Sequence, residues 1–128
     1  MKLLLDTHLL LWAAGTPERL SARARAMIDR PDAEPMVSAA SLWEVAIKAG
    51  LGREDFRVDA AILRRGLLEH GYAELPVSGA HAAAVARLPH VHKDPYDRIL
   101  VAQAQLEGIT LLTTDAIVAR YPGPILNV

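Results

Sequence analysis

Four acidic residues carry the clearest chemistry in this sequence. Asp6 follows a short apolar run directly, Asp115 follows another, Glu44 lies in a helical stretch after a third, and Asp97 lies early in a further helical stretch. Carboxylate oxygens are the hard ligands that Mg²⁺ and Mn²⁺ prefer. A divalent cation held in this way activates water and stabilises the charge on a phosphate during in-line attack. The four acids therefore predict metal-assisted chemistry on a phosphate, with no serine, histidine or cysteine nucleophile.

Each acid also has a purely structural interpretation. Asp6 and Asp115 are suited to cap the helices that follow them, and Ser41-x-x-Glu44 matches a capping box. Asp97 has the spacing of a capping box as well. Capping explains each residue singly, but four carboxylates at one end of a sheet repel one another and raise one another's pKa. Because a divalent cation relieves that repulsion, the set as a whole predicts a metal site.

Polar residues beside the acids are candidates for orienting a carboxylate or a metal-bound water, although capping is an equal alternative for the hydroxyls. The four hydroxyl residues are Thr7, Ser38, Thr113 and Thr114. Asp94 is a further candidate for such an orienting role, and it is expected to cap its helix rather than bind metal, because Pro95 follows it. Arg98 has two open interpretations, a phosphate contact and a surface ion pair.

The remaining residues with chemical potential are given structural roles. His8 is expected to form a structural hydrogen bond. His90 and His92 have the spacing of a metal pair, but they lie in an expected loop without matching ligands, which disfavours a metal role. Trp12 and Trp43 fall at apolar helical positions, which indicates a core or a dimer surface rather than a platform for RNA bases.

Strand and helix patterns alternate along the chain. Strands are expected at 2–5, 36–38, 73–77, 109–113 and 125–128, and helices at 8–14, 20–30, 42–49, 60–70, 81–87, 95–107 and 116–121. This alternation predicts an α/β fold of three layers, with helices on both faces of a parallel sheet of five short strands. If strands one to three run outward and strand four returns beside strand one, Asp6 and Asp115 face each other at the switch point, where ligands bind in such sheets.

Composition narrows the class of protein. The 128 residues fit a single domain over 1–128, and 52% hydrophobic residues supply a core. The absence of cysteine excludes disulfides and thiolate zinc sites and fits a reducing compartment. A net charge of −1 excludes a generally basic nucleic-acid coat protein. Asp6 and His8 interrupt the apolar start of the chain, so we expect a cytoplasmic protein without a signal peptide or membrane span.

Four segments, LLLDTHLLLW, VSAASLWEVAIK, HKDPYDRILVAQA and LLTTD, resemble the motif series of PIN-domain proteins, in particular VapC-type toxins of toxin–antitoxin pairs. The resemblance runs nearly end to end. It implies a Mg²⁺- or Mn²⁺-dependent endoribonuclease that cleaves tRNA or mRNA. It further implies a homodimer that is silenced by a small VapB-like antitoxin. The family's acidic positions then correspond to Asp6, Glu44, Asp97 and Asp115.

Two other classes compete with this interpretation. A phosphohydrolase of the aspartyl-phosphate type needs a second aspartate two residues after the first, where this chain has His8. A non-catalytic PIN-like module that binds RNA or protein stays open, although the presence of all four acids disfavours it. Asp6→Asn is expected to abolish cleavage and leave the fold intact, because it relieves repulsion among the acids.

Overall fold

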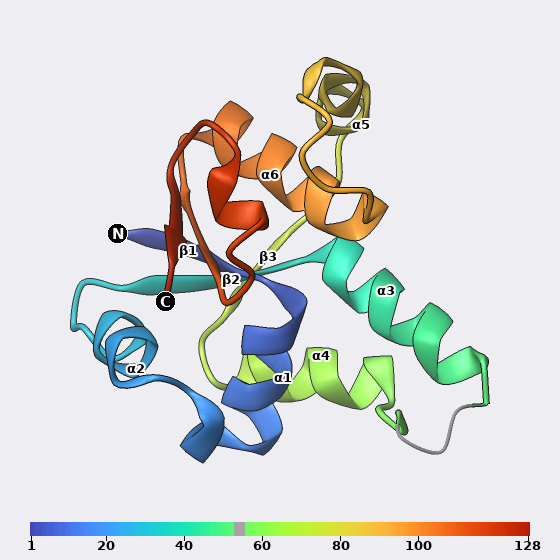
Figure 1. Cartoon of the computed structure of the whole chain (residues 1–128). Helices are drawn as coiled ribbons and strands as arrows, with labels where there is room; N and C mark the ends of the chain where they lie inside the picture. The colour runs from blue at the N-terminus through green and yellow to red at the C-terminus, as the bar shows by residue number, and fades with distance from the viewer. Residues whose placement is uncertain (53–55) are drawn as a thin grey trace.

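The computed structural model describes residues 1–52 and 56–128, and a parallel sheet lies at its centre (Figure 1). The strands of this sheet are β1 (Lys2–Leu5), β2 (Glu34–Ser38), β3 (Ala73–Leu75), β4 (Thr110–Thr113) and β5 (Ile125–Asn127). Their order is β3-β2-β1-β4-β5, and every neighbouring pair is parallel. The predicted switch point between the first and fourth strands is therefore confirmed.

Six α-helices connect the strands within the described residues. They are α1 (Thr7–Gly15), α2 (Ala22–Ile28), α3 (Ala39–Gly50), α4 (Ala60–Glu69), α5 (Gly79–Ala84) and α6 (Pro95–Glu107). Short 3₁₀ turns occupy Pro17–Arg19, Val85–Arg87 and Val118–Arg120. In residues 1–52 and 56–128, every helix is too short or too polar to cross a membrane.

Two helices begin earlier than expected because a serine caps them, and one expected helix is shorter. The helix expected from residue 42 starts at Ala39, because the Ser38 hydroxyl accepts a hydrogen bond from the main-chain N–H of Ala40. The helix expected at 81–87 starts at Gly79, where Ser78 and His81 form a capping box. The short helix expected at 116–121 is reduced to a 3₁₀ turn.

Successive residues of a strand pack into different clusters, which shows that both faces of the sheet are covered. Leu4 packs with residues of α6, whereas Leu3 and Leu5 pack with residues of α1, α2 and α4. All three leucines are fully buried. Strands buried on both faces carry continuous apolar runs, as LLL does here. The predicted three-layer arrangement is therefore confirmed, and the helices on each side are visible in Figure 1.

The ends of β1 and β4 lie side by side at the switch point. Leu5 pairs with Leu112, and the next main-chain N–H, that of Asp6, donates to the carbonyl of Leu112 at 3.0 Å. The chain leaves β4 at Thr113 beside Asp6. Because the register is set by backbone hydrogen bonds, the residues that follow the two strands are brought together.

Helix α6 is fixed at both ends and along its length. Asp94 caps its start, Pro95 occupies its first turn, and Gly108 ends it with φ of +65°, a conformation that favours glycine. The fully buried Gln103 accepts a hydrogen bond from the Ser38 hydroxyl at 2.7 Å and donates to the carbonyl of Pro76 at 3.2 Å. Gln103 therefore ties α6 to the ends of β2 and β3.

Candidate metal centre

Asp6 acts as a helix cap and also points its carboxylate at the switch point. Its Oδ1 accepts from the N–H of Leu9 at 2.9 Å, and its Oδ2 accepts from the Thr113 hydroxyl at 2.8 Å and the Thr114 N–H at 3.2 Å. The residue is 4% exposed. Burial raises the pKa of Asp6, although these hydrogen bonds work in the opposite direction. The capping and cluster interpretations are thus compatible at this position.

Asp97 has the most perturbed carboxylate in the described structure. Its pKa is raised to about 7, first by burial and then by the negative charges of Asp94 and Glu44, with a further contribution from Asp6. His92 partly opposes the shift. The geometry agrees with this crowding, because Thr113 links Asp6 to the start of Asp115 and His92 lies 3.6 Å from Asp97. Ionisation of Asp97 at neutral pH therefore benefits from a nearby cation.

Glu44 lies on α3 with its side chain 5% exposed. Its Oε1 accepts from the Thr7 hydroxyl at 2.6 Å, and its Oε2 pairs with the ammonium of Lys48 at 2.5 Å. The capping box considered for Ser41 and Glu44 is wrong, because α3 begins at Ala39 and both residues lie inside the helix. Glu44 is thus held in place by contacts on two sides, at the edge of the acidic cluster.

Asp115 completes the set of acids directly after β4. Its Oδ1 accepts from the N–H of Ile117 at 2.8 Å, and its Oδ2 accepts from Nε2 of His92 at 3.1 Å. Burial alone raises the pKa of Asp115, but these hydrogen bonds outweigh it and the net pKa is lowered. Asp115 is therefore ionised in conditions where Asp97 still holds a proton.

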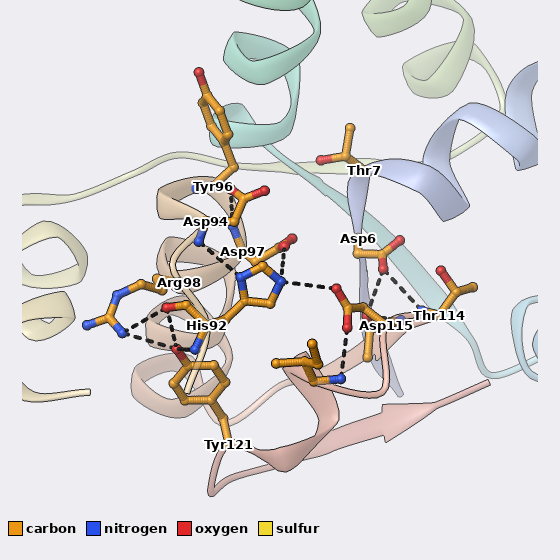
Figure 2. A network of polar contacts seen from close by, with 12 residues as sticks. Asp6, Thr7, His92, Asp94, Tyr96, Asp97, Arg98, Thr114, Asp115 and Tyr121 are labelled. Atoms are coloured by element: carbon orange, nitrogen blue, oxygen red, sulfur yellow. Dashed lines mark hydrogen bonds and ion pairs between the residues drawn. The ribbon is translucent and has the colours of Figure 1, made fainter. Parts of the chain in front are cut away.

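His92 belongs to this cluster, contrary to the expectation that it has no matching partners. Its Nε2 lies 3.6 Å from Oδ2 of Asp97 and 3.1 Å from Oδ2 of Asp115 (Figure 2). One possible metal-ligating atom from each of these three residues lies within 4.8 Å of the other two. The partners come from α6 and from the end of β4, so the loop sequence alone did not reveal them. The sequence offered one sign of a fixed ring, because His92 lies two residues before the helix cap Asp94, whose main-chain N–H donates to Nδ1 of His92.

The predicted hydroxyl residues divide into two groups. Thr113 bridges two acids, since its hydroxyl donates to Asp6 and accepts from the N–H of Asp115 at 3.0 Å. Thr7 reaches Glu44, whereas Thr114 contributes its main-chain N–H. Among the described residues the Ser38 hydroxyl forms no hydrogen bond with an acid; it caps α3 and donates to Gln103.

Asp94 caps α6 as expected, because its Oδ1 accepts from the N–H groups of Tyr96 and Asp97. Arg98 does not form the surface ion pair considered from the sequence within residues 1–52 and 56–128, and its phosphate contact stays a prediction. Its guanidinium donates to the carbonyls of Pro89 and Val85, each at 3.0 Å, and to the Tyr121 hydroxyl at 3.1 Å. These contacts fasten the preceding loop to α6.

The donor set fits a hard divalent cation. Within residues 1–52 and 56–128, no lysine or arginine forms an ion pair with Asp6, Asp97 or Asp115. Three carboxylates therefore share one region without a direct ion pair to a lysine or arginine among these residues, although the ammonium of Lys48 is near enough to interact with the charge of Asp97. Oxygen ligands of this kind suit Mg²⁺ or Mn²⁺.

Sequence comparison gives two matches. The family profile of the PIN domain matches residues 3–124. Ribonuclease VapC22 of Mycobacterium tuberculosis is 32% identical over 124 residues, which cover 95% of each chain.

Structure comparison gives related folds at low sequence identity. VapBC2 from Rickettsia felis, solved with a DNA fragment from its promoter, aligns with a TM-score of 0.70 and 16% identity, covering 98% of this chain and 97% of that one. A toxin–antitoxin complex from Klebsiella pneumoniae aligns with a TM-score of 0.61 and 21% identity, covering 96% and 94%. At these identities the alignments establish the fold.

Proposed function

The chain belongs to the PIN domain family, and from this membership we propose that it is a Mg²⁺- or Mn²⁺-dependent endoribonuclease. The observation that carries the proposal is the convergence of Asp6, Asp97 and Asp115 on the switch point, with Glu44 at its edge. Its curated relative is by name a ribonuclease. The reaction is hydrolysis of an RNA phosphodiester by water.

The proposed ligands of the cation are Asp6, Asp97 and Asp115, with Glu44 as the fourth acidic position. Asp6 is held by three hydrogen bonds and so presents a fixed carboxylate. Asp97 gives up its proton when the cation binds, because its pKa of about 7 reflects crowded negative charge. When bound, the cation supplies the positive charge that activates water and stabilises the phosphate in the transition state. Thr7 and Lys48 keep Glu44 directed at the same region.

We also propose that the chain is the toxin of a type II toxin–antitoxin pair, with a small VapB-like antitoxin and a second copy of itself as protein partners. The solved structures of similar fold support the antitoxin, since they are VapBC or toxin–antitoxin complexes. An apolar hollow of about 510 Å³ between α3, α5 and α6 supports a self-contact. Trp43 and Val77 line this hollow and are 60% and 40% exposed. Apolar side chains that are exposed together, rather than singly, are typical of a contact surface.

The experiment that tests this function is cleavage of a panel of labelled tRNA and mRNA by the purified chain. We expect discrete products with Mg²⁺ or Mn²⁺, none with EDTA, and none from an Asp6→Asn protein purified in parallel. Equal cleavage by both proteins would place the activity in a contaminant. Folded wild-type protein that cleaves no member of the panel with either metal would favour a non-catalytic PIN-like module.

Thr113 provides a test of how the acids are held together. Thr113→Val keeps the shape of the side chain but removes the hydroxyl that donates to Asp6 and accepts from Asp115 N–H. We expect cleavage to fall by about 10–100-fold, the range for residues that orient metal ligands. Thr113→Ser retains the hydroxyl and is expected to stay near the wild-type rate. Steady-state cleavage of one RNA substrate by the three proteins measures the effect, and equal loss in both variants would refute the bridging role.

A further inference from the structure

Both the main-chain N–H and the carbonyl of His92 are held by hydrogen bonds. Its N–H donates to the Tyr121 hydroxyl at 2.8 Å, and the same hydroxyl lies 3.3 Å from the His92 carbonyl, to which it donates. The guanidinium of Arg98 donates to that hydroxyl and to the carbonyl of Pro89 in the same loop. The loop that carries His92 is thus fastened to α6 and to the 3₁₀ turn Val118–Arg120, as Figure 2 shows.

The ring of His92 is fixed in a single orientation and tautomer. The main-chain N–H of Asp94 donates to Nδ1 at 3.0 Å, so Nδ1 carries a lone pair and no proton. The ring proton therefore lies on Nε2, which faces Oδ2 of Asp115 at 3.1 Å. The side chain of His92 is 20% exposed, and that of its partner Asp115 is 38% exposed.

This arrangement determines whether His92 is a ligand or a donor. To bind a cation, Nε2 has to offer a lone pair, and the neutral ring then carries its proton on Nδ1. That proton would point at the N–H of Asp94, which places two donors against each other. The loop geometry therefore disfavours metal ligation by His92, even though its ring nitrogen lies close to two carboxylates.

We propose that His92 is a positioning residue that donates from Nε2 to Asp115 and fixes the direction in which that carboxylate faces the metal centre. Asp115 is then held at both oxygens, by Ile117 N–H at Oδ1 and by His92 at Oδ2. The remaining lone pairs of the two oxygens are left for the cation. This inference rests on the proposed function, because it concerns the same site.

The first arm of the test is the tautomer of His92, measured by ¹⁵N NMR of the ring in the metal-free protein and during Mg²⁺ titration. We expect the Nε2–H form in both states. A change to the Nδ1–H form when Mg²⁺ binds would show that Nε2 has become a ligand, and would overturn the proposal.

The second arm compares three substitutions by calorimetric titration with Mg²⁺ and Co²⁺. His92→Gln places an amide N–H near the position of Nε2, His92→Asn keeps only an acceptor near Nδ1, and His92→Ala removes both. We expect His92→Ala and His92→Asn to lower the affinity for Mg²⁺ and for Co²⁺ by a similar factor of about 10, within the range for residues that orient ligands. His92→Gln is expected to keep much of the wild-type affinity for both metals. If Nε2 of His92 were a metal ligand, its removal would lower the affinity for Co²⁺ more than the affinity for Mg²⁺, and that result would overturn the proposal.

The outcomes separate this proposal from the proposed function. Wild-type protein that binds no Mg²⁺ would overturn the metal site itself. Wild-type protein that binds Mg²⁺, with unchanged affinity in folded His92→Ala, would leave the metal site standing and overturn the role of His92. Circular dichroism and the melting temperature establish that each variant is folded before it is titrated.

Discussion

Asp97→Asn is expected to abolish metal-dependent RNA cleavage and to raise the melting temperature of the metal-free protein at pH 8. The carboxylate of Asp97 has a pKa raised to about 7, so its ionised form is disfavoured in the folded protein. A neutral amide of the same shape removes this penalty. At 1.36 kcal/mol per pKa unit, and allowing for the cost of burying the amide, we expect a gain of about 1–2 kcal/mol in the free energy of unfolding. Cleavage should fall by more than about 100-fold, beyond the effect typical of residues that only orient ligands.

Asp94→Asn is the matched control for this substitution. It removes the same charge three residues earlier in the chain, and asparagine caps a helix as well as aspartate does. We expect this variant to keep most of its activity, because Asp94 caps α6 and is not a proposed ligand. Activity and thermal unfolding, measured side by side, distinguish a lost ligand from a lost charge. If Asp97→Asn cleaves RNA at the wild-type rate, the proposed ligand set is wrong.

Asp97 is also a cleaner probe than Asp6. Asp6 accepts hydrogen bonds from two main-chain N–H groups and one hydroxyl, so an asparagine there turns an amide donor toward at least one of them. A buried donor left unsatisfied costs about 1–3 kcal/mol. The relief of repulsion expected from the sequence for Asp6→Asn is therefore offset in the folded structure, and part of any lost activity would reflect stability.

The stabilisation of the protein by Mg²⁺ is expected to depend strongly on pH. With a pKa of about 7, Asp97 is mostly protonated at pH 6 and mostly ionised at pH 8. A cation that needs the carboxylate has to displace that proton, so its apparent affinity falls by up to about tenfold for each pH unit below 7. The increase in melting temperature caused by millimolar Mg²⁺ should thus be small at pH 6 and several degrees at pH 8.

The stability of the metal-free protein should change with pH in the opposite direction, decreasing as the pH rises. The pKa of Asp97 is higher in the folded state than in the unfolded chain, so its contribution to stability is fully present below about pH 4 and is lost as the pH rises through 7. Scanning fluorimetry at pH 6, 7 and 8, with and without Mg²⁺, measures both effects. Asp97→Asn serves as the control and should flatten both pH dependences. An equal Mg²⁺ shift at pH 6 and pH 8 in the wild-type protein would contradict the assignment of Asp97.

Local signals in the sequence determined which main elements form and where some of them end. Asp94, Pro95 and Gly108 bound α6 because capping, a fixed proline φ and a left-handed glycine act on adjacent residues. The apolar run LLL predicted a strand buried on both faces, and the placement of Asp6 at its end followed directly. The order of the strands was one supposition among the few sheet topologies that alternating strands and helices permit, and the structure has that order.

Only the tertiary structure decided which side chains meet. His92 lies beside Asp115, 23 residues away, because Tyr121 and Arg98 hold the loop that carries its ring. Thr113 lies beside Asp6, across 107 residues, because β1 and β4 pair in one particular register. Arg98 fastens the preceding loop, because α6 places its guanidinium where it donates to the carbonyls of Pro89 and Val85. Periodicity and capping act over a few residues and so fix where elements begin and end. The partners of a polar side chain depend on which elements pack together, and that is settled when the whole core forms.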